Sequence, residues 1–456
     1  MKRSNSPPPP TQPRDLISRG RDVALARVAE HCGRFPDIDF ARERRSMEDP
    51  REAALARSLE AAVLRHWAGL RRIAEVHLKR PWATLDAPAQ SAILVGAAQL
   101  MLFDRIPDHA AVDECVQWAK RPPNGERSGL VNAVLRRVTA MRKERVGAMP
   151  AQEWAQRRDV FPRGDGSAWI LSERSFDEGL VARLAAQCSL TTFTADRWLS
   201  AFGQSDAIDL AAATLVQAPT IVTGIAGTGD GLTPHSEDGF FVYDGSPETL
   251  GTLLASARFA RVQDPASARA VAATASRPAQ LIIDLCAGRG TKTLQLAQVH
   301  PDAQIIATDT DERRRTDLAA RLKRLDDPRI SVVTPAELKQ WEGKADLVLL
   351  DVPCSNSGVL ARRVEARHRL DKAHLESLQS LQRTIAAHGA RLLAPGGTIV
   401  WSTCSLEAEE NSQGAQELVR LTGGRLLQET LVRPAGLPGD SPQRIATGAY
   451  HAIIGT

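Results

Sequence analysis

Residues 281–293 read LIIDLCAGRGTKT, and this stretch decides the fold of the carboxy-terminal part of the chain. An apolar run over 281–285 leads into a glycine-containing loop, and a helical pattern covers 292–299. Further apolar runs at 305–308, 330–333, 347–350 and 398–401 alternate with helical patterns at 312–325, 373–393 and 407–421. Short apolar strands separated by crossover helices predict a doubly wound parallel sheet with both faces buried.

The loop after the first apolar run has the composition of a ligand-binding turn. Gly288 and Gly290 let the backbone approach a ligand, and the amino terminus of the following helix offers free N–H groups. A phosphate-binding P-loop would need glycine in place of Cys286 and Thr291, which disfavours ATP. Asp309 ends the second run 21 residues after Gly288, a spacing at which an acid reaches a ribose hydroxyl pair. The pattern therefore predicts a nucleoside-bearing cofactor.

Two cysteines stand just past the ends of two other apolar runs. Cys354 lies in Asp-Val-Pro-Cys-Ser, which begins at Asp351, and Cys404 lies in Ser-Thr-Cys-Ser. A lone cysteine is usually a buried structural thiol, but such a thiol would stand inside an apolar run. The carboxyl ends of strands in one sheet face a common crevice. Two thiols with a carboxyl group there predict covalent catalysis on an electron-poor ring.

The rest of the chain divides by its pattern into further parts. Residues 1–20 form a Pro-rich tail that we expect to be disordered. Residues 21–148 have a helical period and predict an all-α domain, residues 149–260 predict a small α+β connecting domain, and residues 261–456 form the core. The first 150 residues carry 26 Lys and Arg against 18 Asp and Glu. This surplus is typical of a region that binds the phosphate backbone of a nucleic acid, although a solvated basic helical surface is the simpler interpretation.

Composition excludes several classes of protein. No stretch reaches the roughly 20 apolar residues of a membrane-spanning helix. The polar amino terminus lacks the apolar segment of a secretory signal. We therefore expect a cytoplasmic protein with no membrane part, in which the six cysteines stay reduced. Because no two cysteines are spaced as C-x-x-C, we also expect no metal site.

Together, the core motifs resemble those of the RNA 5-methylcytosine methyltransferases of the Sun and nucleolar-protein-2 family. They are the 284–293 loop, Asp309, DVPCSNSGV at 351–359 and STCSLEAEEN at 402–411. The amino-terminal half, with RIPDHAAV at 105–112 and GLVNAVLR at 129–136, resembles the NusB-like helical domain of antitermination factors. The resemblance implies a Rossmann-like class I methyltransferase core, S-adenosylmethionine as cofactor and small-subunit ribosomal RNA as partner. We expect a monomer.

The resemblance also implies a role for each reacting group. Cys404 would add to C6 of a cytosine, so that C5 attacks the methyl group of the cofactor. Asp351 would hold the cytosine edge, and Cys354 would assist removal of the C5 proton. Asp309 would hold the cofactor ribose. The remaining implied cofactor contacts are Cys286, Ala287, Gly288, Arg289, Gly290, Lys292 and Asp351.

Departures from the family pattern keep a second hypothesis open. Arg289 stands where the family has a proline, and Thr334 stands where an acid would meet the adenine. The alternative is an RNA-binding ribosome-assembly factor with a degenerate, inactive methyltransferase site. An NAD-binding dehydrogenase would leave both loop cysteines unexplained. Arg362, Arg363 and Arg367 either meet RNA phosphates or form a solvated basic stretch.

Overall fold

The computed structural model describes residues 20–40, 47, 49–121, 127–225, 227, 229 and 231–456. Residues 1–19 of the expected disordered tail lie outside this part. The chain divides into two compact units, Met1–Arg142 and Lys143–Thr456. The three-domain limits expected at residues 148 and 260 stay predictions.

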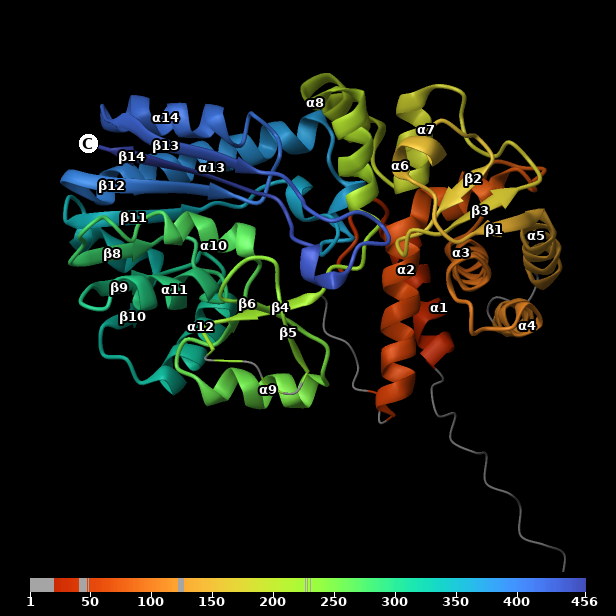
Figure 1. Cartoon of the computed structure of the whole chain (residues 1–456), viewed down its shortest axis with the longest axis horizontal. Helices are drawn as coiled ribbons and strands as arrows, with labels where there is room; N and C mark the ends of the chain where they lie inside the picture. Colours follow the sequence, from red (N-terminus) through yellow and green to blue (C-terminus); the bar gives the residue numbers. More distant parts are fainter. Residues whose placement is uncertain are drawn as a thin grey trace, which may run out of the picture. The chain divides into compact units, whose positions relative to one another are not determined.

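The described part of the first unit is an all-helical bundle, as expected. Its α-helices are α1 (Gly20–Arg34), α2 (Pro50–Glu75), α3 (Ala87–Leu102), α4 (Asp108–Lys120) and α5 (Ser128–Met141) (Figure 1). Helix α3 is apolar on all sides and contacts the other four helices, so it forms the core of the bundle. A side chain at Gly96 would lie 2.4 Å from Leu135, so a glycine is needed where α3 and α5 approach closely.

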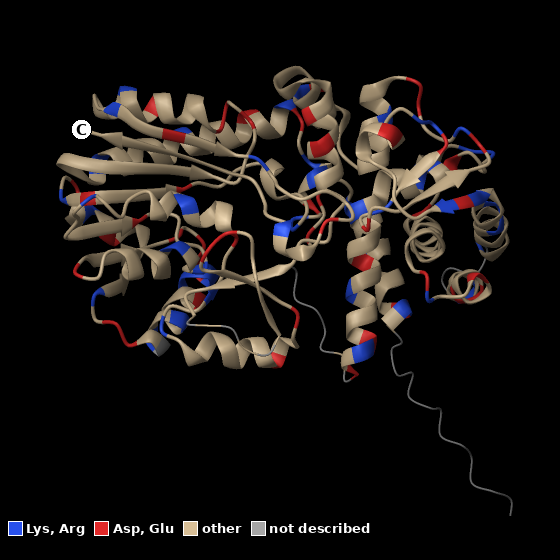
Figure 2. Cartoon of the chain, in the orientation of Figure 1, with Lys and Arg blue, Asp and Glu red and all other residues tan. Residues whose placement is uncertain are grey.

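Charged residues of both signs share the surface of this unit. Arg and Glu residues are interspersed along α2 (Figure 2). Arg71 pairs with Glu75 one turn later at 2.8 Å, and Arg27 pairs with the buried Glu60 at 2.9 Å. Some of the basic side chains are therefore paired within the unit, and a phosphate-binding role for the remaining ones stays a prediction.

The second unit begins with mixed helical and strand segments, in agreement with the expected α+β texture. One small sheet has the order β1-β3-β2, and another has the order β5-β6-β4-β7. Helix α8 is kinked at Gly203, whose φ of 78° is accessible mainly to glycine. The elements are β1 (Arg142–Val146), α6 (Ala151–Trp154), β2 (Val160–Pro162), β3 (Ala168–Leu171), α7 (Leu180–Cys188), α8 (Thr192–Ala213), β4 (Thr220–Thr223), β5 (Leu232–Pro234), β6 (Phe240–Tyr243), α9 (Pro247–Ser256) and β7 (Arg261–Val262).

A seven-stranded sheet forms the centre of the second unit, with the order β10-β9-β8-β11-β12-β14-β13. The first five strands in this order are parallel, which confirms the predicted doubly wound core. Strand β14 runs antiparallel to both neighbours, and this hairpin was not predicted. No α-helix crosses over between β13 and β14, so the chain returns in the opposite direction. The strands are β8 (Leu281–Asp284), β9 (Gln304–Ala307), β10 (Ile330–Val332), β11 (Ala345–Asp351), β12 (Leu393–Thr403), β13 (Arg425–Val432) and β14 (Ala449–Gly455).

Helices cover both faces of this sheet, as its apolar strands require. In β11, Val348 and Leu350 pack into one apolar cluster, whereas Leu347 and Leu349 pack into another. Helices α13 and α14 lie on one side of the sheet, and α10 and α11 lie on the other (Figure 1). The helices are α10 (Pro265–Ala272), α11 (Thr291–Val299), α12 (Glu312–Leu325), α13 (Lys372–Leu392) and α14 (Ser412–Thr422).

The start of α14 corrects one sequence prediction. A helix was expected from residue 407, but α14 begins at Ser412. Glu407 and Glu410 are buried and hold tertiary contacts, and Asn411 has non-helical dihedral angles (φ −102°, ψ −99°). Tertiary bonding therefore overrides the local helical pattern here.

Among the described residues, none of the helices combines the length and apolar character needed to cross a membrane.

Candidate active site

The glycine loop lies between β8 and α11, at the carboxyl end of its strand. Gly288 (φ 55°) and Gly290 (φ 79°) are both left-handed, which explains the need for glycine. A Cβ atom at Gly290 would lie 2.4 Å from a methyl group of Leu318, whereas one at Gly288 would have no atom within 4 Å. The loop is therefore tightly packed on its α12 side and open at Gly288.

Asp309 follows β9 and is linked to this loop. The backbone N–H of Gly288 donates to one carboxylate oxygen of Asp309 at 3.1 Å, and the N–H of Asp311 donates to the other at 2.9 Å. The structure thus brings together the glycine loop and the acid that the sequence paired by spacing.

The two departures from the family pattern have structural explanations. The Arg289 side chain is exposed, while its carbonyl oxygen accepts a bond from Arg321 of α12 at 2.9 Å. Helix α12 thereby holds the backbone at the position where the family has a rigid proline. Thr334 caps a short 3-10 helix, and both its N–H and its hydroxyl group donate to Glu337 at 2.8 Å.

Asp284, the last residue of β8, is fully buried beneath the loop. Its Oδ2 accepts a bond from the Thr293 hydroxyl at 2.7 Å, but Oδ1 has no partner among the described residues. Burial raises the pKa of Asp284 to about 7. A buried oxygen without a protein partner is the kind of atom that a bound ligand or an ordered water satisfies.

This raised pKa predicts a pH-dependent stability. In the folded protein Asp284 keeps its proton up to about pH 7, because its pKa lies well above the usual value of 3.8. The stabilising contribution of Asp284 to the free energy of unfolding is therefore fully present below the pKa of the unfolded chain. It is lost as pH rises toward 7, by on the order of 1 kcal/mol per pH unit. We expect the unfolding temperature of Asp284→Asn to fall less than that of the wild type between pH 5 and pH 7. Equal pH dependence in thermal melts of the two proteins would contradict this.

The two loop cysteines meet at the carboxyl ends of β11 and β12. Their sulfur atoms are 3.2 Å apart, and the Cys404 N–H donates to the Cys354 sulfur at 3.4 Å. Cys354 is buried, whereas Cys404 is partly exposed. The hydrogen bond to Cys404, together with burial, raises the pKa of Cys354 well above its usual value.

Asp351 lies on the same edge of the sheet and bonds both to β12, beside the thiol pair, and to the first turn of α11. Its Oδ1 accepts a bond from the Ser402 hydroxyl at 3.0 Å, and its Oδ2 pairs with Lys292 at 2.8 Å. Burial lowers the pKa of Lys292, but Asp351 outweighs this effect and the net pKa is raised. A charged lysine and a carboxylate therefore border the two sulfur atoms.

A buried acid that was not predicted from the sequence holds the two cysteine loops together. Glu410 is fully buried and accepts bonds from the Ser355 N–H and from Gln382 of α13, both at 2.9 Å. Gln382 also donates to the Pro353 carbonyl at 2.9 Å. Burial raises the pKa of Glu410. Its sequence signal was its place in the STCSLEAEEN motif at 402–411, where it was given no role.

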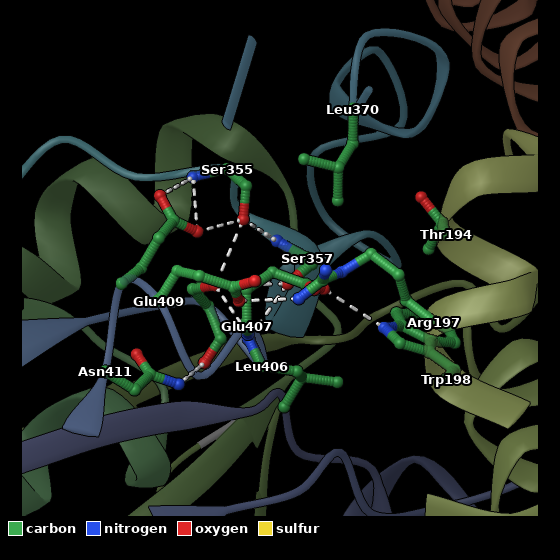
Figure 3. Close-up of polar contacts among 12 residues, drawn as sticks. Thr194, Arg197, Trp198, Ser355, Ser357, Leu370, Leu406, Glu407, Glu409 and Asn411 are labelled. Atoms are coloured by element: carbon green, nitrogen blue, oxygen red, sulfur yellow. Dashed lines mark hydrogen bonds and ion pairs between the residues drawn. The ribbon is translucent and has the colours of Figure 1, made fainter. Parts of the chain in front are cut away.

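Helix α8 fixes the Cys404 loop from a part of the chain about two hundred residues away. Arg197 pairs with Glu407 at 2.6 Å and with Glu409 at 2.5 Å, and the Trp198 indole donates to Glu407 at 3.3 Å. Figure 3 shows Arg197 and Trp198 pointing from α8 toward Glu407. A cavity of about 290 Å³ lies beside these contacts, but its lining includes none of the predicted site residues.

The structure corrects the expectation for Arg367. Its side chain is almost completely buried and donates to three backbone carbonyls, including that of Thr214 at 2.8 Å. It therefore holds the loop after β11 and is not available to RNA. Arg362 pairs with Asp264 at 3.1 Å, and Arg363 is exposed.

The described residues contain no group of three or more His, Cys, Asp or Glu placed to hold a metal ion. The site is thus built from thiols, carboxylates and one lysine.

Comparison with known proteins places this site in a family. Residues 271–437 match the family described as 16S rRNA methyltransferase RsmB/F, and residues 25–140 match the NusB family. The ribosomal RNA small subunit methyltransferase B of Vibrio cholerae is 30% identical over 413 residues, which cover 89% of this chain and 90% of the relative. The chain belongs to the ribosomal RNA small subunit methyltransferase B family. The expected resemblance is therefore confirmed.

Other comparisons agree with this family. The methyltransferase B of Escherichia coli strain SMS-3-5 is 27% identical over 406 residues, covering 83% of this chain and 85% of the relative. The crystal structure of PH0851 covers 96% of this chain and 99% of its own, with a TM-score of 0.68 and 18% identity, and so shares the fold. As a methyltransferase of the B family, the protein uses S-adenosylmethionine, as expected.

Proposed function

We propose that this protein methylates C5 of a cytosine in small-subunit ribosomal RNA through a covalent bond between Cys404 and C6 of the base. The single observation that carries the proposal is the 3.2 Å approach of the Cys354 and Cys404 sulfur atoms beside Asp351. The names of the curated relatives support the substrate.

We assign the nucleophile to Cys404 because the two thiols differ. Cys354 is buried and has a raised pKa, so it keeps its proton when the pair loses one. The charge then lies on Cys404, the more exposed sulfur, and a thiolate is the nucleophilic form of cysteine. This argument disfavours the reverse assignment, in which the cysteine of the Pro-Cys loop attacks the base.

The reaction then divides among the three side chains. The Cys404 proton passes to the Asp351 carboxylate as the thiolate forms a bond to C6, and Asp351 then donates this proton to the base edge as negative charge moves into the ring. S-adenosylmethionine supplies an electrophilic methyl group to C5. With Cys404 bonded to carbon, Cys354 no longer faces a thiolate and loses its proton to solvent water. Its thiolate accepts the C5 proton, and the C5–H electron pair forms the ring double bond. The Cys404–C6 bond breaks with its electron pair on sulfur, and the proton on the base edge returns to Asp351.

We assign the cofactor to the open face of the glycine loop. Asp309 would hold the ribose, and the backbone of residues 286–290, including Cys286, Ala287 and Arg289, would hold the methionine end. Lys292 would stay paired with Asp351 at the centre. The unpaired oxygen of Asp284 supports this placement, because it lies below the same loop.

Loss of Asp309 tests this placement. We expect Asp309→Asn to weaken binding of S-adenosylmethionine about 10- to 100-fold, since a charged acceptor for two hydroxyl groups is lost. Isothermal titration calorimetry measures the affinity, with Asp302→Asn, an exposed acid after α11, as the matched control. Unchanged affinity in the Asp309 variant would show that the ribose binds elsewhere.

The RNA must present its base at the edge of a sheet. A cytosine inside a helix cannot reach the thiol pair, so the target lies in a loop or flips out of its stack. We propose that the NusB-like unit contributes to delivery of this RNA, and that the protein acts as a monomer in the cytoplasm, where ribosomes are assembled.

The proposed activity is tested directly by incubating the purified protein with small-subunit ribosomal RNA and labelled S-adenosylmethionine. The expected product is 5-methylcytidine, located by bisulfite sequencing and lost in Cys404→Ala. If the label reaches no cytosine carbon while RNA and cofactor both bind, the proposed C5 chemistry is wrong. If no heat of cofactor binding is measured at millimolar concentration, the inactive assembly factor becomes the better hypothesis.

A further inference from the structure

Asn356 is a side chain at the thiol pair that the proposed chemistry does not use. It follows Cys354 by two residues and has left-handed dihedral angles (φ 61°, ψ 20°), which asparagine tolerates better than most residues. Its amide nitrogen donates to the Cys354 carbonyl at 2.9 Å. Because a carbonyl only accepts, this bond fixes the amide orientation and turns the amide oxygen toward Cys404.

The Cys404 sulfur lies 3.2 Å from this amide oxygen. An amide oxygen has no proton, so the Cys404 thiol must be the donor. Cys404 has only one S–H group, and therefore the contact between the two sulfur atoms must use the Cys354 proton. The two hydrogen bonds therefore run in the same direction, because Cys354 donates to Cys404 and Cys404 donates to Asn356.

The two neighbours of Cys404 thus have opposite effects on its proton. After Cys404 ionises, the Cys354 S–H still faces the sulfur and stabilises the thiolate. The Asn356 oxygen then faces an anion with no proton between them, which is unfavourable. The charged groups near the pair are Lys292 and Asp351 on one side and Glu410 behind Cys354.

We propose that Asn356 is a positioning residue that keeps the Cys404 thiol protonated, with its S–H bond directed away from Cys354, until the substrate base displaces this hydrogen bond. The inference rests on the proposed role of Cys404 as nucleophile, and it adds a residue that sets when the nucleophile becomes available.

Alkylation of Cys404 by iodoacetamide, mapped by mass spectrometry on the full chain without RNA or cofactor, tests this inference. We expect Asn356→Gly, which keeps the left-handed backbone, to react about five times faster than the wild type at pH 7. Asn356→Asp has nearly the same shape but a stronger acceptor, and we expect it to react about five times more slowly. A wider opening of the site would instead raise the rate of the Gly variant equally at every pH.

The pH profile separates these explanations. Loss of the hydrogen bond should move the rise of the alkylation rate to lower pH in Asn356→Gly and to higher pH in Asn356→Asp. Circular dichroism melts establish that both variants are folded. Profiles that coincide with the wild type, or a faster Asp variant, would overturn the role of Asn356. This readout needs no methyl transfer, so it fails or succeeds independently of the proposed activity.

Discussion

Replacement of Cys354 by alanine is expected to trap the protein on its RNA. In our mechanism this variant can form the Cys404–C6 bond and methylate C5, but it lacks the group that accepts the C5 proton. The bond between protein and RNA then persists, and a denaturing gel should show a slowly migrating adduct in the presence of S-adenosylmethionine. Turnover should fall by on the order of 1000-fold, as is typical when a nucleophile or its partner is removed.

The matched variants decide which sulfur atom attacks. Cys404→Ala should show neither adduct nor methylation, and adding Cys404→Ala to Cys354→Ala should abolish the adduct. An adduct in Cys404→Ala that disappears in the double variant would reverse the two roles. Both thiols are at the carboxyl ends of their strands. Thermal melts of each variant serve as the control that the protein is folded.

Replacement of Asp351 by asparagine should have the second largest effect. Asparagine keeps the shape and can still accept from Ser402, but it cannot supply a proton to the base edge. We expect kcat/KM to fall about 100-fold or more. In the Cys354→Ala background, the rate of adduct formation should fall by a similar factor, because Asp351 acts in the step that forms the Cys404–C6 bond.

Two measurements distinguish this role from simpler ones. Ser402→Ala removes one hydrogen bond to Asp351 and should lower kcat/KM less than about tenfold. Calorimetry with S-adenosylmethionine shows whether Asp351→Asn affects only the cofactor through Lys292. If the Asn variant keeps the wild-type rate at saturating cofactor, Asp351 does not act on the base.

The local pattern of the sequence was sufficient for the frame of the protein. Periods of apolar residues predicted the helical first unit and the five parallel strands of the core. The position of Asp351, Cys354 and Cys404 just after their strands predicted that they would share one edge of the sheet, because parallel strands all end there. The spacing of Gly288 and Asp309 likewise predicted a contact that the structure contains.

Contacts between distant segments depended on packing that no local pattern encodes. The bond of Glu410 to the Ser355 loop and the pairing of Arg197 with Glu407 join residues far apart in the chain, and they move the start of α14 to Ser412. The direction of the hydrogen bonds between the two thiols could not be predicted either, since it depends on the backbone conformation of Asn356. Backbone periodicity is a short-range property and can be read residue by residue, whereas the partner of a side chain is decided only when the sheet and its helices have closed around it.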